Sequence, residues 1–313
     1  MPEGDTVRRS AGRLHQALAG RELTRAELRW PNLGAVQLAG RTVTEVLAYG
    51  KHILTRLAPA TTDAPDGDVA LTLHSHLRMD GSWRVAATGP SSWPHPNRPG
   101  VRAALANAEW TAVGMTLGML DLVATAEEST LVGHLGPDIL ADDFADPASP
   151  WGITEAVRRL TTDPATAIGA ALLDQRNLAG IGTFYMSEAL FSKGISPWTP
   201  IGDVSDPVAV VDRARRMLAT NVVRATPSTT GDLRNGQRQY VHARSGQPCR
   251  RCGIPVRVAM IEVHRRSPGQ TAGIERTAFY CPRCQVGPTP TDDGRAQAPL
   301  GTSGGRGGSY RKG

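Results

Sequence analysis

Two short stretches, C-R-R-C at residues 249–252 and C-P-R-C at residues 281–284, determine how the last third of the chain folds. Together they contain all four cysteines of the 313-residue sequence. Four thiolates presented by two such knuckles across a hairpin match the closed tetrahedral site of a structural zinc ion. We therefore predict a zinc ribbon over 245–285; a redox dithiol or disulfides are the alternative. The ligands of the one structural Zn²⁺ would be Cys249, Cys252, Cys281 and Cys284.

The ribbon segment is rich in arginine and contains a long insertion. Between Cys252 and Cys281 lie 28 residues, whereas about 15–20 is usual between two knuckles. The excess is polar and turn-rich over 265–275, so we expect a loop at the tip of a hairpin. The seven arginines available to bind phosphates are Arg250, Arg251, Arg257, Arg265, Arg266, Arg276 and Arg283.

The whole chain is moderately basic, with 35 Lys+Arg against 29 Asp+Glu and a pI near 9.5. This balance is consistent with a nucleic-acid partner. Only three of the cations are lysines: Lys51, Lys193 and Lys312. Lysine at position 51 is either a solvated surface residue or a compact ammonium with a chemical role. No signal segment and no run of 18 apolar residues is present, so we expect a cytoplasmic protein without membrane association.

The first 141 residues are predicted to form a β-rich domain with a leading helix. Apolar residues recur at helical spacing over 5–19, and Asp5 or Thr6 can cap that helix. From about 22 to 125, short runs alternate with a period near two between Gly, Pro and Asp turns. This pattern indicates an antiparallel sandwich or barrel, with loops over 58–68 and 88–100.

Helical patterns dominate after a linker expected at 142–150, and they define a second domain over 150–240. The expected helices are Ile153–Leu160, Pro164–Leu173, Tyr185–Phe191 and Pro207–Arg224. Beyond the ribbon, 286–313 is rich in Gly, Pro, Ser and Thr and poor in apolar residues, so we expect a disordered tail. The fold class is therefore α+β with several domains.

Two further motifs have both a structural and a chemical interpretation. The segment LLDQRNLAGIGTFYMSEALF at 172–191 places Gly180 and Gly182 between two helical runs. This is a plain helix–turn–helix connection, or a turn whose backbone N–H groups bind a phosphate. The chain begins MPEGDTV. Pro2 can simply start a helix, or, once Met1 is removed, it can offer a free secondary amine.

These motifs together resemble the formamidopyrimidine-DNA glycosylase/endonuclease VIII family of base-excision repair enzymes. The resemblance rests on MPEG, YGKHILTRL around Lys51, HSHLRMDGSWRV at 74–85, the 172–191 segment and ERTAFYCPRCQ at 275–285. MPEGDTV is more similar to the endonuclease VIII-like, actinobacterial branch. The resemblance implies an N-terminal β-sandwich, a helix-two-turn-helix domain and the zinc ribbon. It also implies a monomer that binds damaged DNA with the damaged nucleotide flipped out.

The resemblance also implies roles for single residues. Pro2 would be the nucleophile, Glu3 would protonate the sugar or relay protons, and Lys51 would place a positive charge near the departing group or a phosphate. The DNA-binding residues would be Met79 as a wedge, Arg78 (or Arg102) opposite the unpaired base, Gly182, Thr183 and Arg276. The implied activity is that of a bifunctional glycosylase and abasic-site lyase that removes oxidised bases, chiefly pyrimidines.

The sequence departs from the family pattern at two positions. Thr183 stands where the family has a phosphate-binding asparagine, and Thr6 stands where much of the family has an acid. These departures leave open a non-catalytic scaffold of the same fold that binds damaged or abasic DNA. A more distant alternative is an arginine-rich zinc-ribbon protein that binds RNA or proteins.

Overall fold

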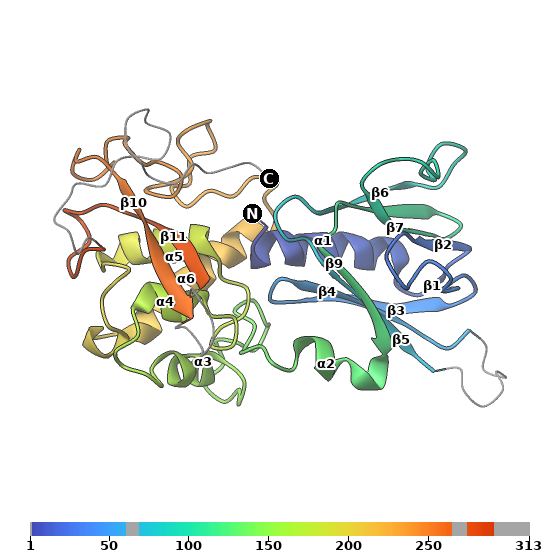
Figure 1. Ribbon diagram of the computed structural model, residues 1–313, viewed down its shortest axis with the longest axis horizontal. Coiled ribbons are helices and arrows are strands. Elements are labelled where there is room, and N and C mark those ends of the chain that lie inside the picture. The colour runs from blue at the N-terminus through green and yellow to red at the C-terminus, as the bar shows by residue number, and fades with distance from the viewer. Residues whose placement is uncertain (1, 61–68, 265–273, 291–313) are drawn as a thin grey trace. The chain divides into compact units, whose positions relative to one another are not determined.

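The computed structural model describes residues 2–60, 69–264 and 274–290 (Figure 1). The chain divides into two compact units, Met1–Leu135 and Gly136–Gly313. The division falls earlier than the expected linker because Ile139, Leu140 and Phe144 are buried in the core of the second unit. Most of the 58–68 loop, the insertion over 265–273 and the tail from 291 lie outside the described residues.

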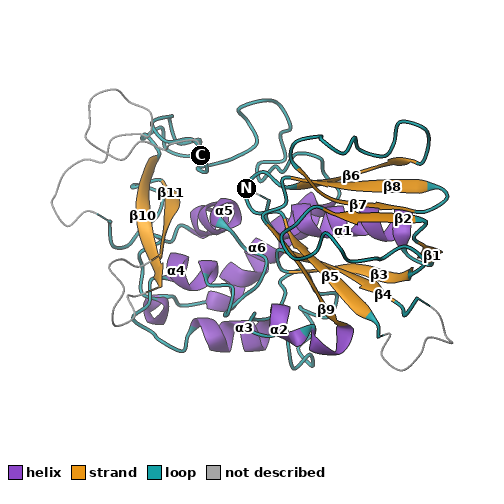
Figure 2. Cartoon of the chain, turned by 45° about the vertical axis from the view of Figure 1, so that its right-hand side comes forward, coloured by secondary structure: helices purple, strands orange, loops and turns teal. Residues whose placement is uncertain are grey.

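The first unit contains two antiparallel sheets (Figure 2). The five-stranded sheet has the order β1-β3-β4-β5-β9, and the four-stranded sheet has the order β2-β7-β8-β6. The strands of the first sheet are β1 Arg21–Glu22, β3 Thr42–Tyr49, β4 His52–Leu57, β5 Leu71–His76 and β9 Met119–Ala124. Those of the second are β2 Arg25–Leu28, β6 Ser82–Ala87, β7 Val101–Ala106 and β8 Trp110–Met115.

One apolar core lies between these sheets, which confirms the predicted sandwich. Helix α1, Gly4–Leu18, contributes the buried Val7, Leu14 and Leu18 to this core, as its periodicity predicts. It contacts β3 and β4 of one sheet and β6 and β8 of the other, so its position is fixed by both layers. A short 3₁₀ turn, η1 at Thr125–Glu127, and helix α2, Ser129–Val132, follow β9; neither was expected from the sequence.

The second unit contains four helices that pack around a core of their own. They are α3 Ile153–Leu160, α4 Ile168–Leu173, α5 Thr183–Lys193 and α6 Pro207–Val222, with a 3₁₀ turn, η2, at Ile201–Asp203. The expected helix start at Pro164 is wrong. The Asp163 carboxylate accepts hydrogen bonds from the Ala165 N–H and the Thr166 hydroxyl, and this local turn replaces the first helical turn.

The ribbon is an antiparallel hairpin of β10, Arg257–His264, and β11, Ile274–Tyr280. In the second unit β10 contacts α4 and β11 contacts α5. A small apolar cluster that includes Phe191, Val241 and Phe279 joins the hairpin to the end of α5. The knuckles are therefore attached to the helical core by apolar packing.

Candidate active site and metal centre

The N-terminal residues are held at the start of a buried helix. The Glu3 carbonyl accepts the Val7 N–H at 3.0 Å, so Glu3 is the N-cap of α1. The side chains of Glu3 and Asp5 are buried, with 3% and 1% exposed, and Pro2 is half-buried. Two acids at the positive end of the helix dipole are electrostatically favoured there. Because the apolar face of α1 is locked into the sandwich, Pro2 emerges from a rigid element.

Lys51 lies in the two-residue turn of the β3–β4 hairpin. Tyr49 and His52 form the last pair of that ladder, and Gly50 has a φ of 57°, a conformation that glycine adopts without strain. Lys51 is half-buried. The tight turn therefore fixes the backbone of Lys51 at the end of the sheet.

Three histidines lie beside Lys51 on the five-stranded sheet, a cluster that the sequence motifs did not reveal. His52 on β4 is directly opposite His76 on β5, and their rings meet edge to face at 4.9 Å. His52 Nδ1 lies 2.8 Å from His74 Nε2, and His74 Nδ1 lies 2.9 Å from Asp121 Oδ2 on β9. A carboxylate only accepts hydrogen bonds, so His74 Nδ1 donates to Asp121 and His52 Nδ1 donates to His74.

Burial keeps these imidazoles neutral. It lowers the pKa of His52 to about 3, with further repulsion from His74, His76, His134 and Lys51. Burial also lowers the pKa of His76 to about 4, with repulsion from Arg78 and Lys51. The pKa of His74 is lowered by burial too, although the hydrogen bond to Asp121 opposes that effect. The cluster therefore offers hydrogen-bonding nitrogens without adding positive charge near Lys51.

Arg78 and Met79 lie in the turn between β5 and β6. Arg78 has a φ of 53°, and its N–H donates to His76 Nδ1 at 2.9 Å. Its side chain runs along Gly118, where any Cβ would lie only 2.0 Å from the Arg78 Cγ. Met79 is 48% exposed, so it is not a core methionine. Arg102, the alternative to Arg78, is exposed on β7, and its guanidinium lies 5.8 Å from the centroid of the Trp30 ring.

The glycine motif of the second unit forms the turn into α5, which confirms the helix–turn–helix connection. Gly180 has a φ of 105°, and its N–H donates to Gln175 Oε1 at 3.0 Å. The Gln175 amide also donates to the Ile181 carbonyl at 2.9 Å, so one side chain holds the whole turn. Gly182 is the N-cap of α5. Thr183 begins the helix and is only 8% exposed.

Glu188 on α5 is a fully buried carboxylate that sequence reasoning did not single out. It accepts hydrogen bonds from the N–H groups of Tyr240, Val241 and His242 at 2.8–2.9 Å, and from the Thr229 hydroxyl. A single acid in a helix of mostly apolar residues was the available signal. Glu188 ties α5 to the loop that leads into the first cysteine knuckle.

The four cysteines come together as predicted. Their Sγ atoms all lie within 4.8 Å of one another, with 3.4 Å between Cys252 and Cys281 and 3.9 Å between Cys249 and Cys284. Sulfurs bound to one tetrahedral zinc at about 2.3 Å are about 3.8 Å apart, and a disulfide is about 2.05 Å long. The N–H groups of Arg251 and Cys284 point at Cys249 Sγ and Cys281 Sγ at 3.4 Å. The cluster is therefore suited to bind one metal ion.

Arg276 lies on β11, opposite Ile261, and is exposed five residues before Cys281. The predicted residues are thus divided between the units. The first unit carries Pro2, Glu3, Lys51, Arg78 and Met79, and the second carries Gly182, Thr183, Arg276 and the cysteines.

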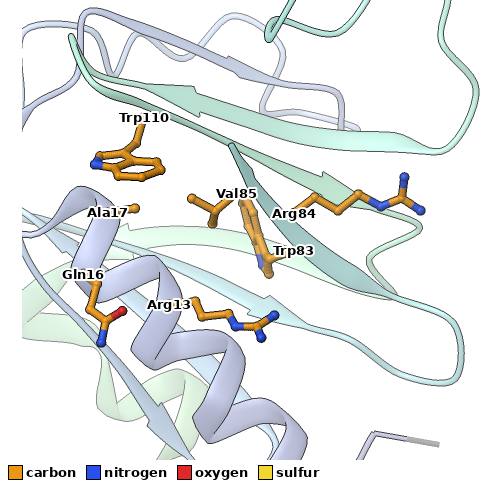
Figure 3. A pocket seen from close by; sticks show the side chains of 7 residues that line it. All are labelled: Arg13, Gln16, Ala17, Trp83, Arg84, Val85 and Trp110. Carbon is orange, nitrogen blue, oxygen red and sulfur yellow. The ribbon is translucent and has the colours of Figure 1, made fainter. Parts of the chain in front are cut away.

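One cavity of the first unit is separate from all these residues (Figure 3). It has a volume of ≈ 450 Å³ and lies between the last turns of α1 and strands β6 and β8. Its lining residues are Arg13, Gln16, Ala17, Trp83, Arg84, Val85 and Trp110. Arg13 lies nine residues after Gly4, the first residue of α1, or about 14 Å along the helix at 1.5 Å per residue, and Pro2 precedes that helix. This cavity is therefore not the predicted active site.

The fold is that of known DNA glycosylases. A crystal structure of the Lactococcus lactis formamidopyrimidine-DNA glycosylase with DNA that contains an abasic site superimposes with a TM-score of 0.67. That match covers 91% of this chain and 100% of the other, at 21% identity. A MutM complex with DNA containing carbocyclic 8-oxo-G gives the same TM-score at 20% identity.

Sequence comparison gives the family. A profile of the formamidopyrimidine-DNA glycosylase N-terminal domain matches residues 1–117. A probable endonuclease 8 2 of Streptomyces coelicolor is 46% identical over 94% of this chain and 98% of its own length. A DNA-(apurinic or apyrimidinic site) lyase of Mycolicibacterium smegmatis is 39% identical over 91% of this chain and 99% of its own length. The chain belongs to the formamidopyrimidine-DNA glycosylase/endonuclease VIII family, which confirms the predicted class of DNA-repair glycosylase and lyase.

Proposed function

We propose that this protein is a bifunctional DNA glycosylase and abasic-site lyase that removes oxidised pyrimidines through a covalent intermediate on Pro2. The observation that carries the proposal is the half-buried Pro2 at the rigid start of α1, directly before the buried carboxyl group of Glu3. The relatives named as endonuclease 8 and as an abasic-site lyase support the same activity.

The chemistry needs a neutral amine near physiological pH. An α-amino group titrates at about pH 7.7–8.0, so a useful fraction of a free Pro2 amine is unprotonated. Its lone pair attacks C1′ of the sugar, the bond between C1′ and the base nitrogen breaks, and the base leaves with the bonding pair and takes up a proton. The Pro2 nitrogen, now bonded to C1′, loses its own proton. The C1′–O4′ bond of the sugar ring then breaks, O4′ takes up a proton, and the nitrogen lone pair forms the C=N⁺ bond of an iminium. The resulting iminium acidifies the C2′ proton, and loss of that proton expels the 3′ phosphate. Glu3 is the proton donor or relay at the sugar.

The other residues of the first unit would bind the DNA around the reacting nucleotide. Lys51 supplies a cation for a phosphate or for the departing group, and the three neutral histidines beside it add no competing charge. Met79 is exposed at a turn, as a wedge that enters a base stack must be. Arg78, whose backbone is held by His76, would occupy the space opposite the unpaired base.

The second unit would hold the backbone of the damaged DNA. Backbone N–H groups at the start of α5, around Gly182 and Thr183, would bind one phosphate, and Arg276 would bind another. We assign one structural Zn²⁺ to the four cysteines. A closed four-thiolate site leaves no position for substrate, so the metal would fold the ribbon that carries Arg276. We place the enzyme as a monomer in the bacterial cytoplasm or nucleoid, where its DNA lies.

Borohydride trapping with an abasic oligonucleotide tests the mechanism. The processed wild-type chain should give a covalent adduct that maps to Pro2 by mass spectrometry. An N-terminal extension that leaves the Pro2 nitrogen acylated should abolish it. An adduct of full yield from the extended protein, or from Pro2→Gly, would refute Pro2 as the nucleophile.

The same reaction separates the enzyme from a non-catalytic scaffold. A chain that binds abasic duplex but gives no adduct under any condition would be the scaffold. Lesion choice is tested with a panel of duplexes that differ only in the damaged base. Release of oxidised purines at rates equal to or above those of oxidised pyrimidines would contradict the proposed preference.

A further inference from the structure

A strongly basic pocket lies at the far end of α5 in the second unit. It has a volume of ≈ 470 Å³. Its lining residues are Phe191, Ser192, Lys193, Arg213, Tyr240, Arg250 and Arg251. Four of these seven residues are cations and none is acidic. The pocket includes Lys193, one of only three lysines in the chain.

The pocket is built from side chains that are already held in place. Arg251 stacks on the Phe191 ring at 4.5 Å, and Phe191 in turn stacks on Tyr240 at 5.4 Å. Arg213 Nε donates to the Ser192 hydroxyl at 3.2 Å. Arg250 Nε donates to the Gln239 carbonyl at 2.9 Å. Holding the guanidinium groups in this way lowers the ordering entropy that ligand binding would otherwise cost.

The positive charge of the pocket is not neutralised by an ion pair among the described residues, although the Arg250 guanidinium also donates hydrogen bonds to the Gln237 side chain and the Gly236 carbonyl. Among the residues that the structure describes, none of the four cations has a carboxylate partner within salt-bridge distance. By contrast, Arg216, which lies on α6 like the pocket residue Arg213, forms an ion pair with Asp212 at 2.9 Å. The C-terminal end of α5 contributes a negative partial charge of about half a unit, which four cations exceed several-fold.

We propose that this pocket is a second phosphate-binding site for the DNA backbone, separate from the glycine turn and from Arg276. It lies ten residues along α5 from Thr183, or about 15 Å at 1.5 Å per residue. A guanidinium held flat against an aromatic ring keeps its edge N–H groups for a phosphate oxygen, and Lys193 adds a mobile cation. This inference rests on the proposed function in one respect only: that the chain binds DNA.

The experiment is the salt dependence of binding to a duplex with a non-cleavable abasic-site analogue, measured by fluorescence anisotropy. Each phosphate contact contributes about 0.9 to the slope of log K against log salt concentration. The Lys193→Ala/Arg251→Ala double variant should therefore lose about 0.9 from the slope and about eightfold in affinity at 0.1 M salt. Lys193→Glu, an exposed single change, should reduce the slope as well. Arg216→Ala, which removes a positive charge of the second unit that does not line the pocket, should leave the slope unchanged.

The outcomes distinguish this site from the proposed catalysis. Equal slopes for the wild type and both pocket variants would overturn the proposal, whatever the yield of trapped adduct. A reduced slope in a protein that forms no adduct would support the pocket and refute only the Pro2 chemistry. The pocket could bind a phosphate of the DNA backbone or a free phosphate compound, and titration with inorganic pyrophosphate distinguishes these two ligands. If pyrophosphate binding requires the pocket but the DNA slope does not, the site takes free phosphate and the DNA proposal is wrong.

Discussion

Replacing His76 with asparagine should change how the stability of the protein depends on pH. In the folded chain, burial lowers the pKa of His76 from 6.5 to about 4. Below pH 6.5 this histidine binds a proton in the unfolded chain but stays neutral in the folded chain. The free energy of unfolding therefore falls as the pH decreases. Between pH 7 and pH 5 one such histidine lowers the free energy of unfolding by about 2 kcal/mol, and the decrease levels off below pH 4.

The change is chosen to keep the local structure. Asparagine Oδ1 can accept the Arg78 N–H in place of His76 Nδ1, a bond of 2.9 Å in the structure. The free energy of unfolding at pH 7 should therefore change little, while the loss on going to pH 5 should be about 2 kcal/mol smaller than in the wild type. Urea unfolding, followed by circular dichroism at steps between pH 5 and pH 7.5, gives the slope of the free energy of unfolding against pH.

The matched control is His95→Asn. His95 also accepts, through Nδ1, the N–H of the residue two positions on, at 3.2 Å from Asn97, but it is exposed. This variant should keep the wild-type slope. If His76→Asn and His95→Asn show the same pH dependence as the wild type, the folded protein does not hold His76 neutral, and the reasoning about the histidine cluster fails.

Three other changes test the second unit. Cys281→Ser should release the metal, measurable with a zinc-sensitive dye, and should weaken DNA binding; retained binding and lyase activity would make the ribbon dispensable. Glu188→Ala should lower the free energy of unfolding by about 3 kcal/mol, because one buried and two partly buried N–H groups each lose their acceptor; a thermal melt within 2 °C or so of the wild type would contradict this. Gln175→Ala should raise hydrogen exchange at Gly180 without changing the metal content, and unchanged exchange would show that the turn does not depend on this side chain.

The chemistry-bearing positions that the sequence could predict are those set by local spacing. Two C-x-x-C knuckles and the glycine turn specify their geometry within a few residues, so the cysteine cluster and the turn before α5 were predicted correctly. The helix itself begins at Thr183, two residues before the expected Tyr185. The histidine cluster could not be predicted in this way. His52, His74 and Asp121 are brought together only by the register of three strands, β4, β5 and β9, which are far apart in the chain. A one-residue slip in either pairing would place these side chains on opposite faces.

The sequence was also misleading where a side chain competes with the backbone. The apolar spacing after Pro164 favours a helix, but Asp163 satisfies the first N–H groups locally and delays the helix to Ile168. The boundary between the two units, after Leu135, also lies earlier than the linker expected at 142–150. The composition of 142–150 is typical of a linker, yet packing of Ile139 and Phe144 on the helical core begins before it. Local composition indicates where a chain can bend, whereas burial decides where a unit ends.

The substitution at position 183 illustrates how the two ends of α5 differ. Thr183 stands where the family pattern has an asparagine, and it is only 8% exposed, so the phosphate that we propose for this end would be bound mainly by backbone N–H groups. Those groups carry about half a positive charge between them, whereas the pocket at the other end contains four full cations: three arginines whose side chains are held in place, and the mobile Lys193. Backbone groups fix the geometry of one phosphate at little ordering cost, and the guanidinium groups supply the long-range attraction. The salt dependence of DNA binding should therefore arise more from the C-terminal end of α5 than from the glycine turn.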